Sequence, residues 1–195
     1  MKKYLQIALM IFFVSAVFTS CKDDDDDDEE EAAVEAYKLE NEKAFAAKAN
    51  DPDYFKVVVQ GSGDYFVYAK KLKEGDGVPI YYTSHVKTYY RGWLATETRD
   101  NYFDKKEFED GEPLECALST SYATTSYTSS GTTTGVTAVI TGWAIALQHM
   151  RVGDKWEVWI PQQLGYGSTE QDDIPAYSTL VFEIEVVERS AIVGG

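Results

Sequence analysis

The sequence predicts an α+β domain in which a twisted antiparallel β-sheet curls over one short α-helix, preceded by an N-terminal helical stalk. Two observations support this fold class. From Tyr54 onward the chain consists of short segments rich in β-branched and aromatic residues, separated by glycine turns. Within that part, only one segment carries apolar residues at helical spacing. A single short helix among many strands must bury its apolar face against a sheet.

The first 21 residues have the layout of a secretory signal peptide. A basic start (MKK) precedes an almost unbroken apolar run over residues 5–18, and the small residues Thr19 and Ser20 stand before Cys21. The run is short for a membrane span. A cysteine at this junction resembles a bacterial lipoprotein signal, which implies that Cys21 is lipidated and that the protein is anchored in the cell envelope, at the outer membrane. Plain secretion and a retained membrane anchor are the alternatives.

Residues 22–31 form an acidic segment with nine consecutive carboxylates at positions 23–31. Because so many like charges repel one another, we expect an extended, solvated tether. It serves either as a spacer or as a surface-export tag, since a lysine and acidic residues behind the cysteine resemble a signal used by one group of Gram-negative bacteria. The net charge of −15 argues against nucleic acid as a partner, because phosphate repels it.

Residues 32–50 predict a helical stalk. The segment is rich in Ala, Glu and Lys, and the sequence Asn50-Asp51-Pro52 would end a helix. Its apolar residues form no regular stripe, so we expect a solvated helix, with dimerisation as the other possible use. The oligomeric state is left open.

The strands are predicted in two groups. Residues 51–77 contain leading strands around the turn at residues 61–63, and residues 78–189 contain the main domain, with a central strand at 86–94. In the closing strand, Leu180, Phe182, Ile184 and Val186 point one way and the intervening glutamates the other. Residues 190–195 are a tail.

The main domain contains an insertion at residues 119–138, where thirteen of twenty residues are Ser or Thr. Such a segment has little to bury, so it predicts a long flap or an irregular hairpin. The threonines equally suit an additional pair of strands.

The one helix of the domain is predicted just after this insertion. Trp143, Ala146, Leu147 and Met150 fall on a single helical face, and Gly153 ends the run. Farther on, Trp156 and Trp159 are expected on opposite faces of a strand, one in the core and the other at solvent or the flap.

Several kinds of active site find no support in the sequence. It has no GxSxG, P-loop or GxGxxG motif, and His85 and His149 lack the spacing of metal ligands. Cys116 alternates with leucines, which favours a small buried residue over a nucleophile, and with Cys21 lipidated no internal disulfide can form. We therefore expect no metal and no cofactor.

Several motifs occur together in one order along residues 78–188. They are VKTYYRG at 86–92, Phe103-Asp104, VITGW at 139–143, ALQHMRVG at 146–153, Ile160-Pro161, LGYG at 164–167, Ile174-Pro175 and TLVFEIE at 179–185. Together they resemble the FKBP-type peptidyl-prolyl isomerases. The resemblance implies an enzyme that accelerates rotation about X-Pro bonds in exported or surface proteins, with proline-containing polypeptides as its partners.

The chemistry of that reaction explains the residue types. Rotation about an X-Pro bond faces a barrier of about 20 kcal/mol. The twisted amide is less conjugated and less dipolar than the planar one, so a dry aromatic pocket favours it without a nucleophile, metal or cofactor.

The resemblance also implies a role for each pocket residue. Trp143 would form the floor, and Tyr90, Phe103 and Phe182 the aromatic walls. The Ile140 N–H and the Tyr166 hydroxyl would hold substrate carbonyls, and Asp104 would orient Tyr90. The remaining lining would comprise Leu114, Val139, Ile140 and Ile174.

The sequence departs from the family pattern at four places. The stretch before Phe103 is a few residues long, Leu114 replaces a frequent aromatic wall, the loop at 168–173 is short and acidic, and the insertion enters just before Val139. These departures leave a second hypothesis open: a non-catalytic peptide-binding or chaperone-like module on the same scaffold. A surface protein that merely keeps the fold is a third.

Overall fold

The computed structural model describes residues 25–59, 62–120, 126–127, 133–134 and 136–191. The predicted signal peptide and the lipidation site Cys21 lie outside these residues. The chain divides into two compact units, Met1–Val34 and Glu35–Gly195. In the described part, no helix combines the length and the apolar character needed to cross a membrane.

Helix α2 (Asp25–Ala47) begins inside the acidic segment and is followed by the 3₁₀ turn η1 (Lys48–Asn50). The stalk predicted for residues 32–50 is thus helical, but the helix starts earlier than the sequence suggested. Residues 25–31, expected to be extended, have helical backbone. Glutamate is a good helix former, and carboxylates near a helix N-terminus interact favourably with its dipole.

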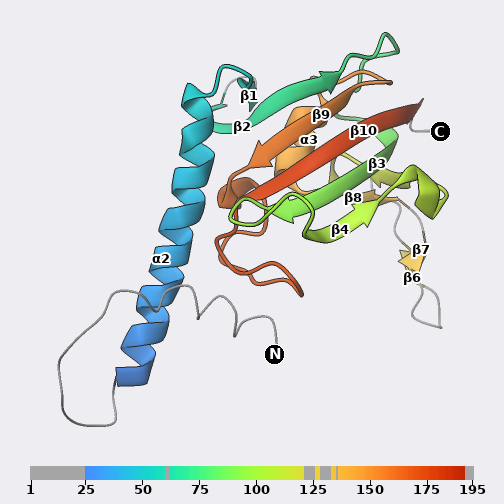
Figure 1. Cartoon of the computed structure of the whole chain (residues 1–195). Coiled ribbons are helices and arrows are strands. Elements are labelled where there is room, and N and C mark those ends of the chain that lie inside the picture. Colours follow the sequence, from blue (N-terminus) through green and yellow to red (C-terminus); the bar gives the residue numbers. More distant parts are fainter. Residues whose placement is uncertain (1–24, 60–61, 121–125, 128–132, 135, 192–195) are drawn as a thin grey trace. The chain divides into compact units, whose positions relative to one another are not determined.

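Eight strands form one sheet, with the order β1-β2-β9-β10-β3-β5-β8 and with β4 paired to β3 (Figure 1). The strands are β1 (Phe55–Val59), β2 (Ser62–Lys73), β3 (Ser84–Leu94), β4 (Tyr102–Lys106), β5 (Leu114–Ala117), β8 (Thr137–Ala138), β9 (Lys155–Ile160) and β10 (Leu180–Ala191). Every pair is antiparallel except β5 and β8, which run parallel, so the sheet is mixed rather than purely antiparallel. The leading strands β1 and β2 belong to this same sheet, because β2 pairs with β9.

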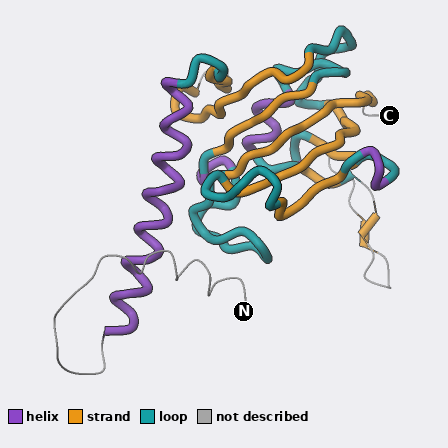
Figure 2. Tube along the Cα trace, in the orientation of Figure 1, coloured by secondary structure: helices purple, strands orange, loops and turns teal. Residues whose placement is uncertain are grey.

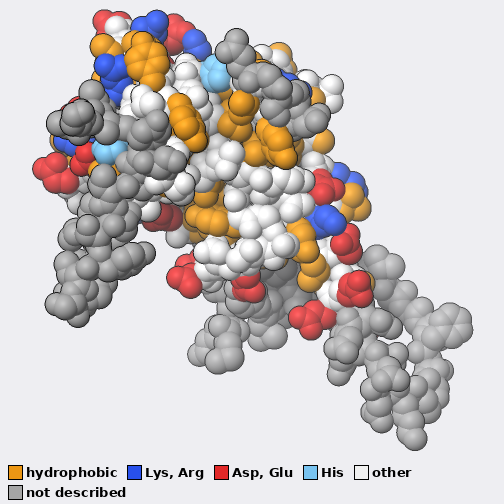
Figure 3. Space-filling view, turned by 180° about the vertical axis from the view of Figure 1, so that it is seen from behind, with side chains coloured by type: hydrophobic (Ala, Val, Ile, Leu, Met, Phe, Trp, Pro, Cys, Tyr) orange, Lys and Arg blue, Asp and Glu red, His pale blue; other side chains and the backbone are white. Residues whose placement is uncertain are grey.

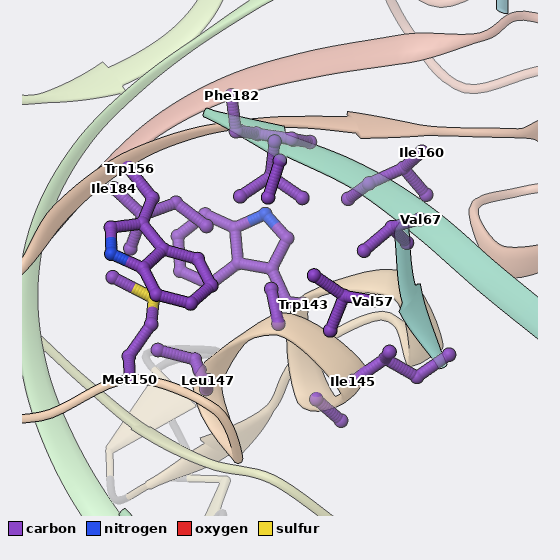
Figure 4. Packing of buried hydrophobic residues seen from close by; sticks show 14 of the residues in the cluster. Val57, Val67, Trp143, Ile145, Leu147, Met150, Trp156, Ile160, Phe182 and Ile184 are labelled. Atoms are coloured by element: carbon purple, nitrogen blue, oxygen red, sulfur yellow. The ribbon is translucent and has the colours of Figure 1, made fainter. Parts of the chain in front are cut away.

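Helix α3 (Thr141–Leu147) packs on one face of the sheet and closes the core. Trp143, Leu147 and Met150 are all at least 96% buried, and Figure 4 shows them gathered with Trp156 and Ile184. A Cβ on Gly142 would lie 2.3 Å from Ile160 Cγ2, so glycine lets the helix approach strand β9 this closely. The predicted α+β fold, one short helix against a curled sheet, is confirmed.

The alternation predicted along β9 and β10 is present, but much of the face away from α3 is buried as well. Trp156 is buried in the core, whereas Trp159 lies on the other face, where its ring contacts Tyr54 edge-on. On β10, Leu180, Phe182, Ile184 and Val186 are buried on the α3 side, and Val181 is buried on the opposite face. Glu183, on the opposite face, is also buried, because cationic side chains from neighbouring elements cover it.

Within the insertion, β6 (Ser126–Tyr127) and β7 (Thr133–Thr134) pair as a separate antiparallel ribbon, and β8 at its end joins the main sheet. Figure 2 shows the long loop between β9 and β10 in teal, and Figure 3 shows hydrophobic and acidic side chains on the face turned away in Figure 1. Between β9 and this loop lies the 3₁₀ turn η4 (Gln162–Leu164).

Candidate functional site

Four aromatic side chains meet at one end of helix α3. The Trp143 ring makes edge-to-face contacts with Tyr90 and Phe182, each with ring centroids 5.2 Å apart. Phe103 packs edge-on against Phe182 at 5.5 Å. These four residues, called here the aromatic cluster, come from α3, β3, β10 and β4. Edge-to-face geometry is favourable for aromatic rings, so the packing itself orients them.

A polar pair borders the aromatic cluster. The Tyr90 hydroxyl donates a hydrogen bond to Asp104 Oδ2 at 2.7 Å. Burial raises the pKa of Tyr90, and the hydrogen bond to the Asp104 carboxylate raises it further. The phenol therefore stays protonated well above neutral pH and keeps its hydrogen on Asp104.

Gly92 lets two rings of the aromatic cluster approach the backbone of β3. A Cβ at this position would lie 2.5 Å from Phe182 Cε1 and 2.8 Å from Phe103 Cζ. Any larger residue would push one of these rings aside. Gly92 is opposite both Phe182 and Asp104 in the strand pairing, so it is central to the site.

An open cleft of about 680 Å³ adjoins the aromatic cluster, with which it shares Phe103. Tyr166 and Ile174 line it from the loop between β9 and β10, and Asp104 lines it from β4. The remaining lining residues are Glu170, Gln171, Asp172 and Asp173. Four of the eight lining side chains are carboxylates, so the cleft wall is acidic.

Residues 165–179, called here the cleft loop, have a backbone closed by internal hydrogen bonds. The N–H of Tyr177 donates to Gly167 O at 2.7 Å, which joins the two stems. Gln171 and Ile174 exchange hydrogen bonds of 2.9 and 3.1 Å near the tip. Tyr177 has a φ of 65°, an uncommon left-handed conformation for a side chain of this size.

Two further titratable groups near the site have raised pKa values. Burial raises the pKa of Tyr166, and the nearby Asp104 charge adds to this effect. Cys116 is buried, and the loss of solvent raises the pKa of its thiol to about 12. In the residues that the structure describes, no group of three His, Cys, Asp or Glu side chains is placed to hold a metal ion.

The structure brings most of the residues suggested by the resemblance into one region. Tyr90, Phe103, Trp143 and Phe182 form the aromatic cluster, and Asp104, Tyr166 and Ile174 line the cleft beside it. Partly buried side chains pack against the same core at three further predicted positions, Leu114, Val139 and Ile140. Ile140 also precedes α3 and accepts the first hydrogen bonds of the helix through its carbonyl.

The longer stretch before Phe103 does not displace this residue from Phe182. Residues 95–101 fold into turns, and β4 then pairs Asp104 with Gly92 of β3. With this register of β4, Asp104 lies beside Tyr90 and Phe103 lies beside Phe182.

Sequence reasoning missed one residue next to the cleft loop. Asn41 of α2 is completely buried and accepts a hydrogen bond from the backbone of Thr179, at the end of that loop. The segment around it was expected to be solvated on all sides. A lone asparagine inside a helix gives no signal from which this contact could be found.

Comparison with known proteins identifies the family. Residues 70–187 match the family model described as FKBP-type peptidyl-prolyl cis-trans isomerase. The chain is 36% identical over 118 residues to the FKBP-type 22 kDa peptidyl-prolyl cis-trans isomerase of Escherichia coli, covering 60% of this chain and 47% of that protein. It is 28% identical to a Buchnera aphidicola isomerase, FkpA, over 80% of this chain and 54% of the relative. The chain thus spans about half the length of these relatives.

A solved structure supports the same assignment. The chain resembles a peptidyl-prolyl cis-trans isomerase from Pseudomonas syringae with a TM-score of 0.60 and 25% identity, covering 80% of this chain and 96% of that one. FkpA from Escherichia coli has the same fold, with a TM-score of 0.59 over 96% of this chain and 79% of that chain, at 21% identity. On the family match, which covers more than half of its residues, the chain belongs to the FKBP-type peptidyl-prolyl cis-trans isomerase family.

Proposed function

We propose that this protein catalyses the cis–trans isomerisation of X-Pro bonds in polypeptides and that the aromatic cluster and the adjoining cleft are its active site. The observation that carries the proposal is the convergence of Tyr90 and Phe182 on Trp143, with Phe103 packed against Phe182, beside a cleft large enough for a peptide segment. The family membership supports the same reaction.

The apolar part of the site would favour the twisted amide because that state is less dipolar than the planar one. The proline ring rests on Trp143 between the walls formed by Tyr90, Phe103 and Phe182, with Leu114, Val139, Ile140 and Ile174 completing the lining. A planar amide loses part of its dipole as it twists, so these side chains stabilise the twisted state more than the planar one. Differential stabilisation of that kind lowers the barrier of about 20 kcal/mol without a covalent step.

The polar part of the site would hold the peptide in place. The Ile140 N–H and the Tyr166 hydroxyl donate to substrate carbonyls on either side of the rotating bond. Asp104 keeps the Tyr90 hydroxyl turned toward the rim through their 2.7 Å hydrogen bond. The two hydrogen bonds to the substrate carbonyls fix the peptide on both sides of the rotating bond. The free energy of binding then holds the peptide in the geometry in which it reacts.

A protease-coupled assay with an X-Pro peptide tests this proposal on the purified full chain. We expect acceleration over uncatalysed exchange, which takes on the order of tens of seconds. Peptide binding without acceleration would replace this proposal with the non-catalytic peptide-binding or chaperone-like module. A folded protein with neither property would leave only a surface protein that keeps the fold.

We also propose that the protein acts in the cell envelope as a lipoprotein. Residues 1–21 would be its signal peptide and Cys21 its lipidated residue, with the acidic segment between the anchor and the isomerase region at 78–189. Exported proteins would then be its substrates. Cys21→Ser should abolish membrane partitioning in a cell-fractionation experiment, whereas Cys116→Ser should not; unchanged partitioning of the first variant would refute the anchor.

A further inference from the structure

The C-terminal half of helix α2 makes specific contacts with the end of the cleft loop. The Thr179 N–H donates to Asn41 Oδ1 at 2.7 Å, and the Thr179 hydroxyl donates to Asn41 O at 3.1 Å. The Asn41 amide nitrogen donates to Tyr37 O of its own helix at 3.0 Å. Asn41 is 0% exposed, and every side-chain group of this asparagine that can bond is engaged. Asparagine is unfavourable inside a helix, and here its side chain is engaged in this contact.

A second contact extends from the same helix toward the cleft. Ser178 Oγ donates to Pro175 O at 2.7 Å, and it lies 2.8 Å from the Tyr37 hydroxyl. Because the single hydroxyl hydrogen of Ser178 is used on Pro175, the Tyr37 hydroxyl is the donor to Ser178. A continuous chain of hydrogen bonds thus joins Tyr37 to the residue that directly follows Ile174, a lining residue of the cleft.

Two backbone hydrogen bonds also hold this end of the cleft loop. Its stems are joined by the bond from Tyr177 N to Gly167 O, and Thr179 O accepts from the N–H of Ala95. The ammonium of Lys38 lies 5.3 Å from the centroid of the Tyr177 ring, whose backbone is in the left-handed conformation. Figure 1 shows this loop, between β9 and β10, beside the part of α2 in the same unit, residues 35–47.

We propose that Tyr37 and Asn41 are positioning residues for the isomerase site: the helix in front of the family domain holds the cleft loop so that Tyr166 and Ile174 face the bound peptide. The proposal rests on the proposed function for its effect on activity. Residues 35–47 then form part of the functional domain, although the family match begins only at residue 70.

The test compares variants of the full chain. Asn41→Ala removes the contact to Thr179, and Tyr37→Phe keeps the ring while removing only the donor to Ser178. Leu39→Ala is the control on the exposed side of the same helix, and Val57→Ala is a buried control on β1 that lowers stability away from the cleft loop. Steady-state isomerisation is measured where all variants are folded, together with amide hydrogen exchange over residues 165–179.

We expect Asn41→Ala to raise KM and lower kcat/KM by about three- to tenfold, the effect of losing one or two hydrogen bonds, with kcat nearly unchanged. Amide exchange should accelerate in the cleft loop, and Tyr37→Phe should show the same pattern more weakly. Both controls should keep the wild-type kcat/KM and loop exchange, even where Val57→Ala lowers the melting temperature.

The proposal would be overturned if Asn41→Ala kept the amide exchange and the kcat/KM of the wild type. It would also be overturned if Val57→Ala lost as much kcat/KM as Asn41→Ala. Should Asn41→Ala fail to fold, Tyr37→Phe decides in the same way. An inactive wild type would instead refute the proposed function. In that case, amide exchange in the cleft loop and the Kd for a proline peptide would be compared between wild type and variants. These two measurements would then decide whether α2 positions the loop.

Discussion

The Tyr90 hydroxyl donates a 2.7 Å hydrogen bond to Asp104, and this bond joins β3 to β4 at the border of the aromatic cluster. The two residues are 14 positions apart in the sequence and become neighbours only because β4 folds back antiparallel on β3. The bond ties the orientation of a ring that contacts Trp143 to a carboxylate that lines the cleft.

This pair should behave as one unit in a double-mutant cycle. Tyr90→Phe and Asp104→Val should each lower kcat/KM, Asp104→Val more strongly because it also removes the charge at the cleft. The double variant should lose less than the product of the two effects, since either change alone breaks the shared bond. Steady-state kinetics with one X-Pro peptide measures the cycle; strictly multiplicative losses would mean that the bond does not serve catalysis.

Gly92→Ala should damage the aromatic cluster directly. The new methyl group would overlap the rings of Phe103 and Phe182, and overpacking of this kind costs about 1–3 kcal/mol of folding stability. Activity should fall as well, because the rings must move. Gly77→Ala, which crowds Val152 instead, is the matched control and should lower stability with little effect on kcat/KM. Equal activity of the two folded variants would contradict this prediction.

Tyr166→Phe should reduce activity only modestly. The change keeps the ring at the cleft and removes one hydrogen bond, a loss of about 0.5–1.5 kcal/mol, so kcat/KM should fall severalfold to about tenfold. Tyr82→Phe removes a hydroxyl from an exposed tyrosine outside the cleft and should have no such effect. A loss of several orders of magnitude in Tyr166→Phe would indicate chemistry other than stabilisation of a twisted amide.

The acidic wall of the cleft should favour peptides with a cationic residue beside proline. Asp172 and Asp173 line the proposed peptide site, and an opposite charge nearby contributes about 1 kcal/mol at 4 Å in water. The ratio of kcat/KM for Lys-Pro over Glu-Pro peptides should decrease severalfold in the double variant Asp172→Asn/Asp173→Asn and at high salt. Asp76→Asn, an exposed aspartate outside the cleft, is the control, and an unchanged ratio in the double variant would refute the preference.

Glu183 should contribute to stability at neutral pH and lose that contribution in acid. Burial opposes its charge, but the hydrogen bond from Lys155 at 2.7 Å, together with Arg91 and Arg99, holds the pKa of Glu183 below its ordinary value. A group with a lowered folded pKa stabilises the protein above its unfolded pKa of about 4.3, and this stabilisation is lost as the pH falls through the folded pKa.

Glu183→Gln should therefore unfold more easily at pH 7 than the wild type and show a shallower loss of stability between about pH 5 and pH 3. Denaturant unfolding at a series of pH values measures both. Glu188→Gln, which removes the exposed partner of Lys87, should leave the curve almost unchanged. Parallel curves for wild type and Glu183→Gln would contradict the prediction.

Local sequence patterns sufficed for much of this protein. The alternation along β10 and the apolar face around Trp143 predicted a helix packed on a sheet, because burial of an apolar face leaves few other arrangements. The motifs containing Tyr90, Phe103 and Tyr166 carried the family resemblance, because they occur together in one order along the chain. The inferences about β10 and α3 succeeded because the periodicity of a strand or a helix decides which of its side chains face the core.

Contacts between distant segments were decided only by the tertiary structure. The parallel pairing of β5 with β8, the burial of Glu183 among three cations and the docking of Asn41 against Thr179 have no local signature. Asn41 and Thr179 are 138 positions apart, and a polar residue in a helix is ordinarily solvated. The sequence by itself therefore determined the main strands, the helix around Trp143 and the family resemblance. The tertiary structure decided which polar groups become buried partners, because that depends on surfaces that meet only when the chain has folded.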